Sequence, residues 1–199
     1  MEWGVQNLYL RSVPRLVNRF WVSQNSGVIE VHVDSDWAGN RIDRKSTTGV
    51  VVRYGGQVVK TYSRNQKTVA LSSGEAELYA IVSGTSEALG IQSIIRDFGR
   101  DGYVVVNTDS IAAIGITKRS GNGRIRHLQT QFLWIQELVV GGRISIYKVP
   151  GNVNPADLMT KYLGGESIAQ CIRFMNLVKS LNRPDNAPLL QSVYYHWFY

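Results

Sequence analysis

Four carboxylates that lie far apart along the chain have positions from which they could act together. The chain holds 15 Asp and Glu residues against 22 Lys and Arg residues, so the place of each acid is informative. Asp34 ends an alternating apolar segment and Asp109 directly follows an apolar run, whereas Glu77 and Asp157 fall in the first turns of predicted helices. Strand ends and helix starts can meet at one edge of a sheet. We therefore expect these side chains, from four different elements, to converge.

Such a cluster would need cations. Like charges about 4 Å apart repel by about 1 kcal/mol in bulk water and by about 4 kcal/mol at an effective dielectric constant of 20. The cluster would either bind metal ions or raise some of the carboxyl pKa values. Oxygen ligands suit Mg²⁺ or Mn²⁺, and the sequence has no Cys/His cluster that would favour zinc.

Each acid also has a structural interpretation when it is taken alone. Glu77 and Asp157 would both suit the positive end of a helix dipole. Asp34 and Asp109 could simply be turn residues at strand ends. Only the set of four, in this order, favours a functional site.

Alternation of apolar and polar residues predicts three consecutive strands. The first begins at Val28 and alternates through Asp34, which also makes His32 more typical of a structural residue than of a catalytic one. Two further segments, 48–54 and 57–63, flank a Gly-Gly pair that is typical of a β-hairpin turn. These three strands are expected in antiparallel order.

Helices and strands alternate in the rest of the chain. Ser72 or Ser73 can cap a long helix that continues to Gly99. The further elements expected are a buried strand at 103–106, a short helix at 110–117, a helix at about 128–140, a strand at 143–149 and a helix that opens at Asn154-Pro155. This order predicts an α/β fold, with a mixed five-stranded sheet of three antiparallel strands followed by parallel ones, and helices packed on it.

Composition narrows the possible partners and the compartment. The net charge of +7 and the isoelectric point near 9.6 favour a polyanionic partner, nucleic acid first, although a surplus that serves solubility is an open alternative. Cys171 is the single cysteine, which excludes a disulfide framework and suits a reducing compartment, cytoplasmic or nuclear. We expect no membrane span and no secretory signal, because Glu2 and several arginines interrupt the apolar residues near the start.

Six short blocks occur in a characteristic order. They are DSDWAG at 34–39, RKSTTG at 44–49, VALSSGEAE at 69–77, NTDS at 107–110, Arg126-His127 with the helix after it, and 149–157 followed by Thr160-Lys161. In this order the blocks resemble the ribonuclease H domain of copia-type retrotransposon Pol polyproteins, over about residues 28–163. Residues 1–25 more weakly resemble the segment that joins the reverse transcriptase to that domain. The expected organisation is a connecting segment (1–25), a ribonuclease H-like domain (26–165), and a C-terminal helix with an aromatic tail (166–199).

The resemblance implies an endoribonuclease that hydrolyses the RNA strand of RNA–DNA hybrids. In that family four carboxylates hold two Mg²⁺ ions, for which Mn²⁺ can substitute, and the matching residues here are Asp34, Glu77, Asp109 and Asp157. Two metal ions about 3.5–4 Å apart can activate water and neutralise the charge that builds on a phosphoryl group. The family's motifs favour Asp34 over Asp36 and Glu77 over Glu75, whereas periodicity leaves both choices open. The implied partners are the hybrid and the reverse transcriptase domain of the same polyprotein.

Substrate contacts are expected mainly at phosphates and at the 2′-hydroxyls that distinguish a hybrid. The loop before Asp157 lacks the histidine that many ribonucleases H carry there, and His127 is the nearest candidate for that role, with a local structural bond as the alternative. Competing hypotheses are a degenerate remnant that only binds nucleic acid or a polymerase domain, and a DNA nuclease or integrase of related fold. The expected nucleic-acid contacts are Arg44, Lys45, Arg64, Lys67, Ser72, Ser73, Asn107, Arg124 and Arg126.

Overall fold

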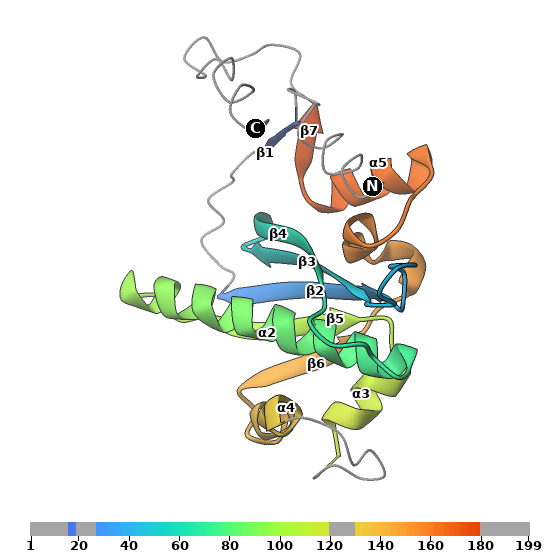
Figure 1. Ribbon diagram of the computed structural model, residues 1–199. Coiled ribbons are helices and arrows are strands. Elements are labelled where there is room, and N and C mark those ends of the chain that lie inside the picture. Colours follow the sequence, from blue (N-terminus) through green and yellow to red (C-terminus); the bar gives the residue numbers. More distant parts are fainter. Residues whose placement is uncertain (1–15, 19–26, 120–129, 180–199) are drawn as a thin grey trace, which may run out of the picture.

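Strands rich in β-branched residues form one five-stranded mixed sheet in the computed structural model, which describes residues 16–18, 27–119 and 130–179 (Figure 1). The strand order is β4-β3-β2-β5-β6. Strand β2 pairs antiparallel with β3 on one side and parallel with β5 on the other, so the mixed α/β sheet expected from the sequence is confirmed. The strand bounds are β2 Val28–Asp36, β3 Thr47–Tyr54, β4 Gln57–Asn65, β5 Tyr103–Thr108 and β6 Ile144–Lys148.

Three helices cover one face of the sheet, α2 (Ser73–Asp97), α3 (Ile111–Thr117) and α4 (Thr130–Val140). Their apolar side chains and the inward side chains of β2, β3, β5 and β6 form the main core. Helix α2 lies very close to the strands at Gly84, where an added Cβ would come within 2.5 Å of the Val33 Cγ1 atom. A glycine is therefore required at this contact, because a methyl group would force the long helix away from the sheet.

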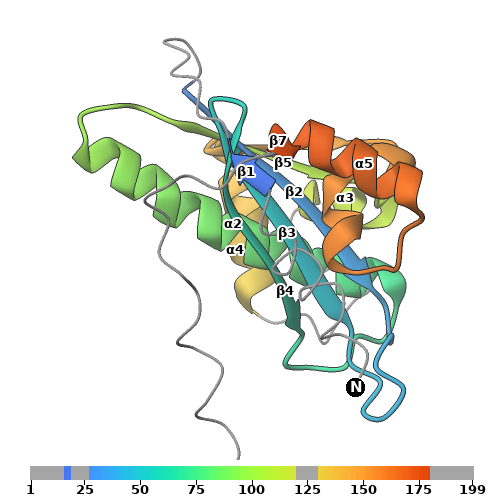
Figure 2. The ribbon, with the colours of Figure 1, turned by 90° about the horizontal axis from the view of Figure 1, so that it is seen from above.

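The opposite face is covered over β2 and β3 by the short 3-10 helix η2 (Pro155–Met159) and by α5 (Gly165–Phe174), and a second 3-10 helix, η1 (Gly151–Val153), contacts α5. Figure 2 looks onto this face, with α2 and α4 behind the strands. A second apolar cluster joins the layers, and its buried residues are Val51, Leu158, Met159, Cys171 and Met175.

The helix expected from Asn154-Pro155 is a 3-10 helix that ends at Met159. The backbone N–H of Thr160 donates to the carbonyl oxygen of Asp157, three residues back, at 3.1 Å, as in a 3-10 turn. This turn fits tightly against β3 at Gly49, where an added Cβ would lie 2.7 Å from the carbonyl oxygen of Ala156.

A separate antiparallel pair, β1 (Leu16–Asn18) with β7 (Leu177–Lys179), was not expected from the sequence. The predicted roles of Arg124, Arg126 and His127, most of the 1–25 segment and the aromatic tail lie outside the described residues. The domain division at residue 165 stays a prediction. None of the described helices is long and apolar enough to span a membrane.

Candidate functional site

The parallel register of β2 and β5 brings Asp34 and Asp109 to the same edge of the sheet. In this register His32 of β2 pairs with Asn107 of β5. Asp34 lies two residues beyond His32, and Asp109 lies two residues beyond Asn107, just after β5 ends. Asp34 is almost completely buried, whereas Asp109 is half-buried.

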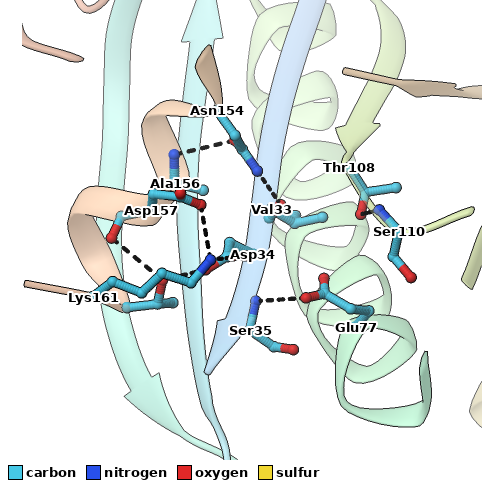
Figure 3. Close-up of polar contacts among 11 residues, drawn as sticks. Val33, Asp34, Ser35, Glu77, Thr108, Ser110, Asn154, Ala156, Asp157 and Lys161 are labelled. Atoms are coloured by element: carbon cyan, nitrogen blue, oxygen red, sulfur yellow. Dashed lines mark hydrogen bonds and ion pairs between the residues drawn. The ribbon is translucent and has the colours of Figure 1, made fainter. Parts of the chain in front are cut away.

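Glu77 reaches this edge from the first turns of α2. The helix begins at Ser72, whose hydroxyl oxygen accepts a hydrogen bond from the Glu75 N–H at 3.2 Å, one of the two caps that the sequence left open. The Glu77 Oε1 atom accepts a hydrogen bond from the backbone N–H of Ser35 at 3.2 Å, which fixes the carboxylate beside Asp34 (Figure 3). Its other oxygen, Oε2, is buried and has no hydrogen-bond partner among the described residues.

Three carboxylates thus meet at the sheet edge. Asp34, Glu77 and Asp109 each offer an oxygen within 4.8 Å of the others, which is close enough to share a metal ion. Their neighbouring acids are directed elsewhere. The Asp36 carboxylate lies against the backbone of Gly39, where an added Cβ would meet it, and the Glu75 carboxylate accepts a hydrogen bond from the Leu71 N–H at 2.9 Å.

Asp157 approaches the same group from η2, on the other side of Asp34. It is linked to Asp34 by Lys161, whose ammonium nitrogen lies 3.1 Å from Asp34 Oδ1 and 3.3 Å from Asp157 Oδ1 (Figure 3). Asn154 anchors the turn, since its amide nitrogen donates to the carbonyl oxygen of Val33 at 2.9 Å and its amide oxygen accepts from the Ala156 N–H at 3.2 Å. The structure therefore brings together all four carboxylates that the sequence singled out, with Asp157 joined through a lysine.

Burial and mutual repulsion raise the carboxyl pKa values. Burial, followed by the nearby charge of Asp34, raises the pKa of Glu77 to about 8 and that of Asp157 to about 6. The same two causes raise the pKa of Asp109. Burial lowers the pKa of Lys161, but Asp34 and Asp157 outweigh it and raise this pKa to about 12. The cluster therefore lacks the positive charge needed to balance its carboxylates, as expected of carboxylates that are arranged to bind cations.

Several residues that shape the site were not identified from the sequence as functional. Thr160 donates its hydroxyl hydrogen to Asp34 Oδ2, and Lys161 and Asn154 make the contacts described above. At Gly151 an added Cβ would lie 2.8 Å from Asp109 Oδ2, so a residue larger than glycine would displace that carboxylate. The four-residue spacing from Asp157 to Lys161 was a usable signal for an ion pair.

The described candidates for nucleic-acid binding mostly lie on loops near the carboxylates. The indole N–H of Trp37 donates to the Ala70 carbonyl at 3.1 Å and thereby connects the loop after β2 with the loop before α2. Arg44 and Lys67 are exposed on these loops, and Ser72 and Ser73 are exposed at the start of α2.

The other described candidates have local partners. Lys45 pairs with Asp43 at 3.4 Å, and the Arg64 guanidinium lies 4.8 Å from the centre of the Tyr62 ring. Asn107 is half-buried on β5, with its amide nitrogen 3.5 Å from His32 Nε2.

His32 lies on the same sheet face as Asp34 but inside the protein. It packs edge-on against Phe174 of α5, with ring centroids 4.9 Å apart. Burial, followed by the charge of Arg53, lowers its pKa to about 4. These contacts agree with the structural role expected from the strand pattern.

Comparison with solved structures shows which fold the chain has. A ribonuclease H1 isolated from compost, LC11-RNase H1, superposes with a TM-score of 0.52, is 17% identical, and matches 73% of this chain and 99% of that one. The fold is therefore that of ribonuclease H.

Comparison of the amino-acid sequence shows which proteins the chain is similar to. The retrovirus-related Pol polyprotein from transposon TNT 1-94 of Nicotiana tabacum is 32% identical over 146 residues, 72% of this chain. That from transposon RE2 of Arabidopsis thaliana is 27% identical over 158 residues, 78% of this chain. In both cases the chain spans 11% of the relative's length, and no family model matches it. The chain is thus similar to retrovirus-related Pol polyproteins of plant transposons and has the ribonuclease H fold, and these findings confirm the resemblance noted in its motifs.

Proposed function

We propose that this chain is a divalent-metal-dependent endoribonuclease that hydrolyses the RNA strand of RNA–DNA hybrids. The observation that carries the proposal is the meeting of Asp34, Glu77 and Asp109, from three elements, within 4.8 Å of one another. Carboxylates this close and this buried are unfavourable unless cations bind among them.

The residues at the site fit a pair of Mg²⁺ ions. All the donors are carboxylate oxygens, which suit hard cations, and the buried Glu77 Oε2 atom lacks a partner within the described chain. Asp34, Glu77 and Asp109 would hold one ion, and Asp34 with Asp157 would hold the other. The pair would supply an activated water and neutralise the charge that develops on the phosphoryl oxygens.

The protein itself contributes position. The Ser35 N–H fixes Glu77, and Asn154 fixes the turn that carries Asp157, so the carboxylates are held in place before substrate arrives. Exposed Arg44 and Lys67 on the adjoining loops would hold substrate phosphates. Ser72 and Ser73, at the exposed start of α2, would read the hybrid's sugar hydroxyls.

The proposal also includes a partner domain for this chain. The Pol polyproteins that the chain resembles favour a reverse transcriptase domain as its neighbour and reverse transcription as its task. A reducing compartment, cytoplasmic or nuclear, stays a prediction from the single cysteine.

The decisive experiment measures cleavage of a labelled RNA–DNA hybrid by the full chain with Mg²⁺, beside single-stranded RNA and duplex DNA. We expect cleavage of the hybrid alone, loss of cleavage with a chelator, and recovery when Mg²⁺ or Mn²⁺ is restored. Asp109→Asn is expected to lower the rate by more than about a hundredfold while circular dichroism stays unchanged, because one ion loses a ligand.

Asp101→Asn is the matched control, because Asp101 is an exposed aspartate before β5, at the opposite end of that strand. Full activity in Asp109→Asn would remove the site assignment. Hybrid binding without cleavage under any metal condition would instead favour the binding-module hypothesis, and preferential cleavage of duplex DNA would favour a DNA nuclease.

A further inference from the structure

The Lys161 ammonium group lies inside the carboxylate cluster, where a metal ion would bind. Its nitrogen is 3.1 Å from Asp34 Oδ1 and 3.3 Å from Asp157 Oδ1, so it bridges the two carboxylates that approach from β2 and η2 (Figure 3). A cation that contacts an oxygen of each carboxylate makes the same links that a shared metal ion would make.

This arrangement divides the cluster into two unequal halves. On the Asp34–Asp157 side the carboxylate charges are already compensated in part by Lys161, and Thr160 donates its hydroxyl hydrogen to the other oxygen of Asp34. On the side formed by Asp34, Glu77 and Asp109, the buried Glu77 Oε2 atom has no hydrogen-bond partner in the described structure. A divalent ion can enter the second half without displacing a cation, whereas entry into the first half must move the ammonium group away.

The Lys161 side chain is able to leave the carboxylate cluster. Its side chain is 41% exposed, and its flexible four-carbon stem could turn the ammonium group into solvent. Asp34 is 1% exposed and held within β2, so the lysine is the partner that moves.

We propose that Lys161 is a tethered cation that competes with one of the two divalent ions for the Asp34–Asp157 position. The two ions then bind in order. The first binds at Asp34, Glu77 and Asp109, and the second binds only at concentrations high enough to displace the lysine. This inference rests on the proposed metal-dependent function and adds a dependence of activity on metal concentration.

The test titrates the full chain with Mn²⁺ in the absence of nucleic acid and follows free Mn²⁺ by electron paramagnetic resonance. For the wild type we expect one ion bound tightly and a second bound about tenfold or more weakly. Lys161→Met keeps the apolar stem and removes the charge, so the dissociation constant of the second ion should fall by about tenfold while that of the first changes by less than about threefold.

Three further variants sharpen the comparison. Lys161→Arg keeps the charge and should bind the second ion as weakly as the wild type does. Lys161→Gln repeats the neutral substitution with a different side chain, should Lys161→Met fail to fold by circular dichroism. Lys148→Met is the matched control, because Lys148 is an exposed lysine whose charge reaches Asp109 through space, and it should leave the second dissociation constant within about twofold of wild type.

The possible outcomes separate this inference from the proposed function. The competition is overturned if both neutral variants leave the second dissociation constant unchanged or make it larger, since the lysine would then only orient the carboxylates. It is also overturned if the wild type binds two ions with equal affinity, even where hybrid cleavage that depends on Asp109 upholds the function. If the wild type binds no Mn²⁺ and cleaves no hybrid, both proposals fail.

Discussion

Two glutamates on the same helix show how finely position determines a residue's role. Glu75 and Glu77 are two residues apart, so their side chains leave α2 in directions about 200° apart. Glu75 turns back to the Leu71 N–H before the helix, whereas Glu77 turns to the Ser35 N–H on β2 and joins Asp34 and Asp109. One carboxylate thus supports the start of the helix and the other belongs to the candidate site.

A paired substitution tests this difference. Glu77→Gln should lower metal-dependent hybrid cleavage by more than about a hundredfold, because the amide removes a negative ligand from the group of three. Glu75→Gln should keep cleavage within about threefold of wild type, because the amide oxygen can still accept from the Leu71 N–H. Initial rates at saturating Mg²⁺ check both expectations. The reverse ranking of the two variants would contradict the placement of Glu77.

At the scale of elements, the turn after β6 is held in place by close contacts with the sheet. Gly49, which pairs with Asp34 across β2 and β3, leaves room for the η2 backbone. Asn154 ties the start of η2 to the carbonyl oxygen of Val33, directly before Asp34. The distance between Asp34 and Asp157 therefore depends on how η2 sits on the sheet.

Asn154→Asp is the sharpest test of that attachment. Aspartate keeps the capping acceptor but loses the donor to Val33, and it places a buried carboxylate against a carbonyl oxygen. We expect the free energy of unfolding to fall by about 2 kcal/mol, as measured by urea denaturation, together with a loss of hybrid cleavage.

Asn152→Asp is the control for the same change of residue type, because Asn152 is exposed in η1. It should leave stability within about 0.5 kcal/mol of wild type. Equal stability of the Asn154 and Asn152 variants would show that the buried amide contributes little.

At the scale of the whole molecule, positive charge and buried carboxylates are separated. The net charge is +7, and exposed cations such as Arg44 and Lys67 lie on the loops around an acidic centre. Phosphates of a nucleic acid would meet the surrounding cations first, and their binding would release counterions.

The salt dependence of hybrid binding measures this contribution. The measurement uses an Asp109→Asn background, which prevents cleavage. In this background Arg44→Gln and Lys67→Gln should each make the negative slope of log K against log salt shallower by about 1. Lys60→Gln is the control, because Lys60 lies on the edge strand β4 and pairs with Glu87 of α2. Slopes that remain unchanged in the first two variants would place the hybrid elsewhere on the surface.

Much of the architecture could be predicted because its signals are local. Alternation marked the strand that became β2, the Gly-Gly pair marked the β3–β4 hairpin, and a serine before the acidic turn marked the start of α2. Prediction was weaker where local signals are weak. The turn at Pro155 is a five-residue 3-10 helix, and the β1–β7 pair joins segments with no shared local pattern.

By itself, then, the sequence determined which residue types were available and which elements carry them, since helical and strand periodicities and caps act within a few residues. It also carried the motifs that resemble those of copia-type Pol polyproteins. Only the tertiary structure decided that Asp34, Glu77 and Asp109 meet, and that Lys161 lies between Asp34 and Asp157. Those contacts depend on strand order, on the β2–β5 register and on the fit of η2 against Gly49, which join residues too distant along the chain for any local pattern to relate.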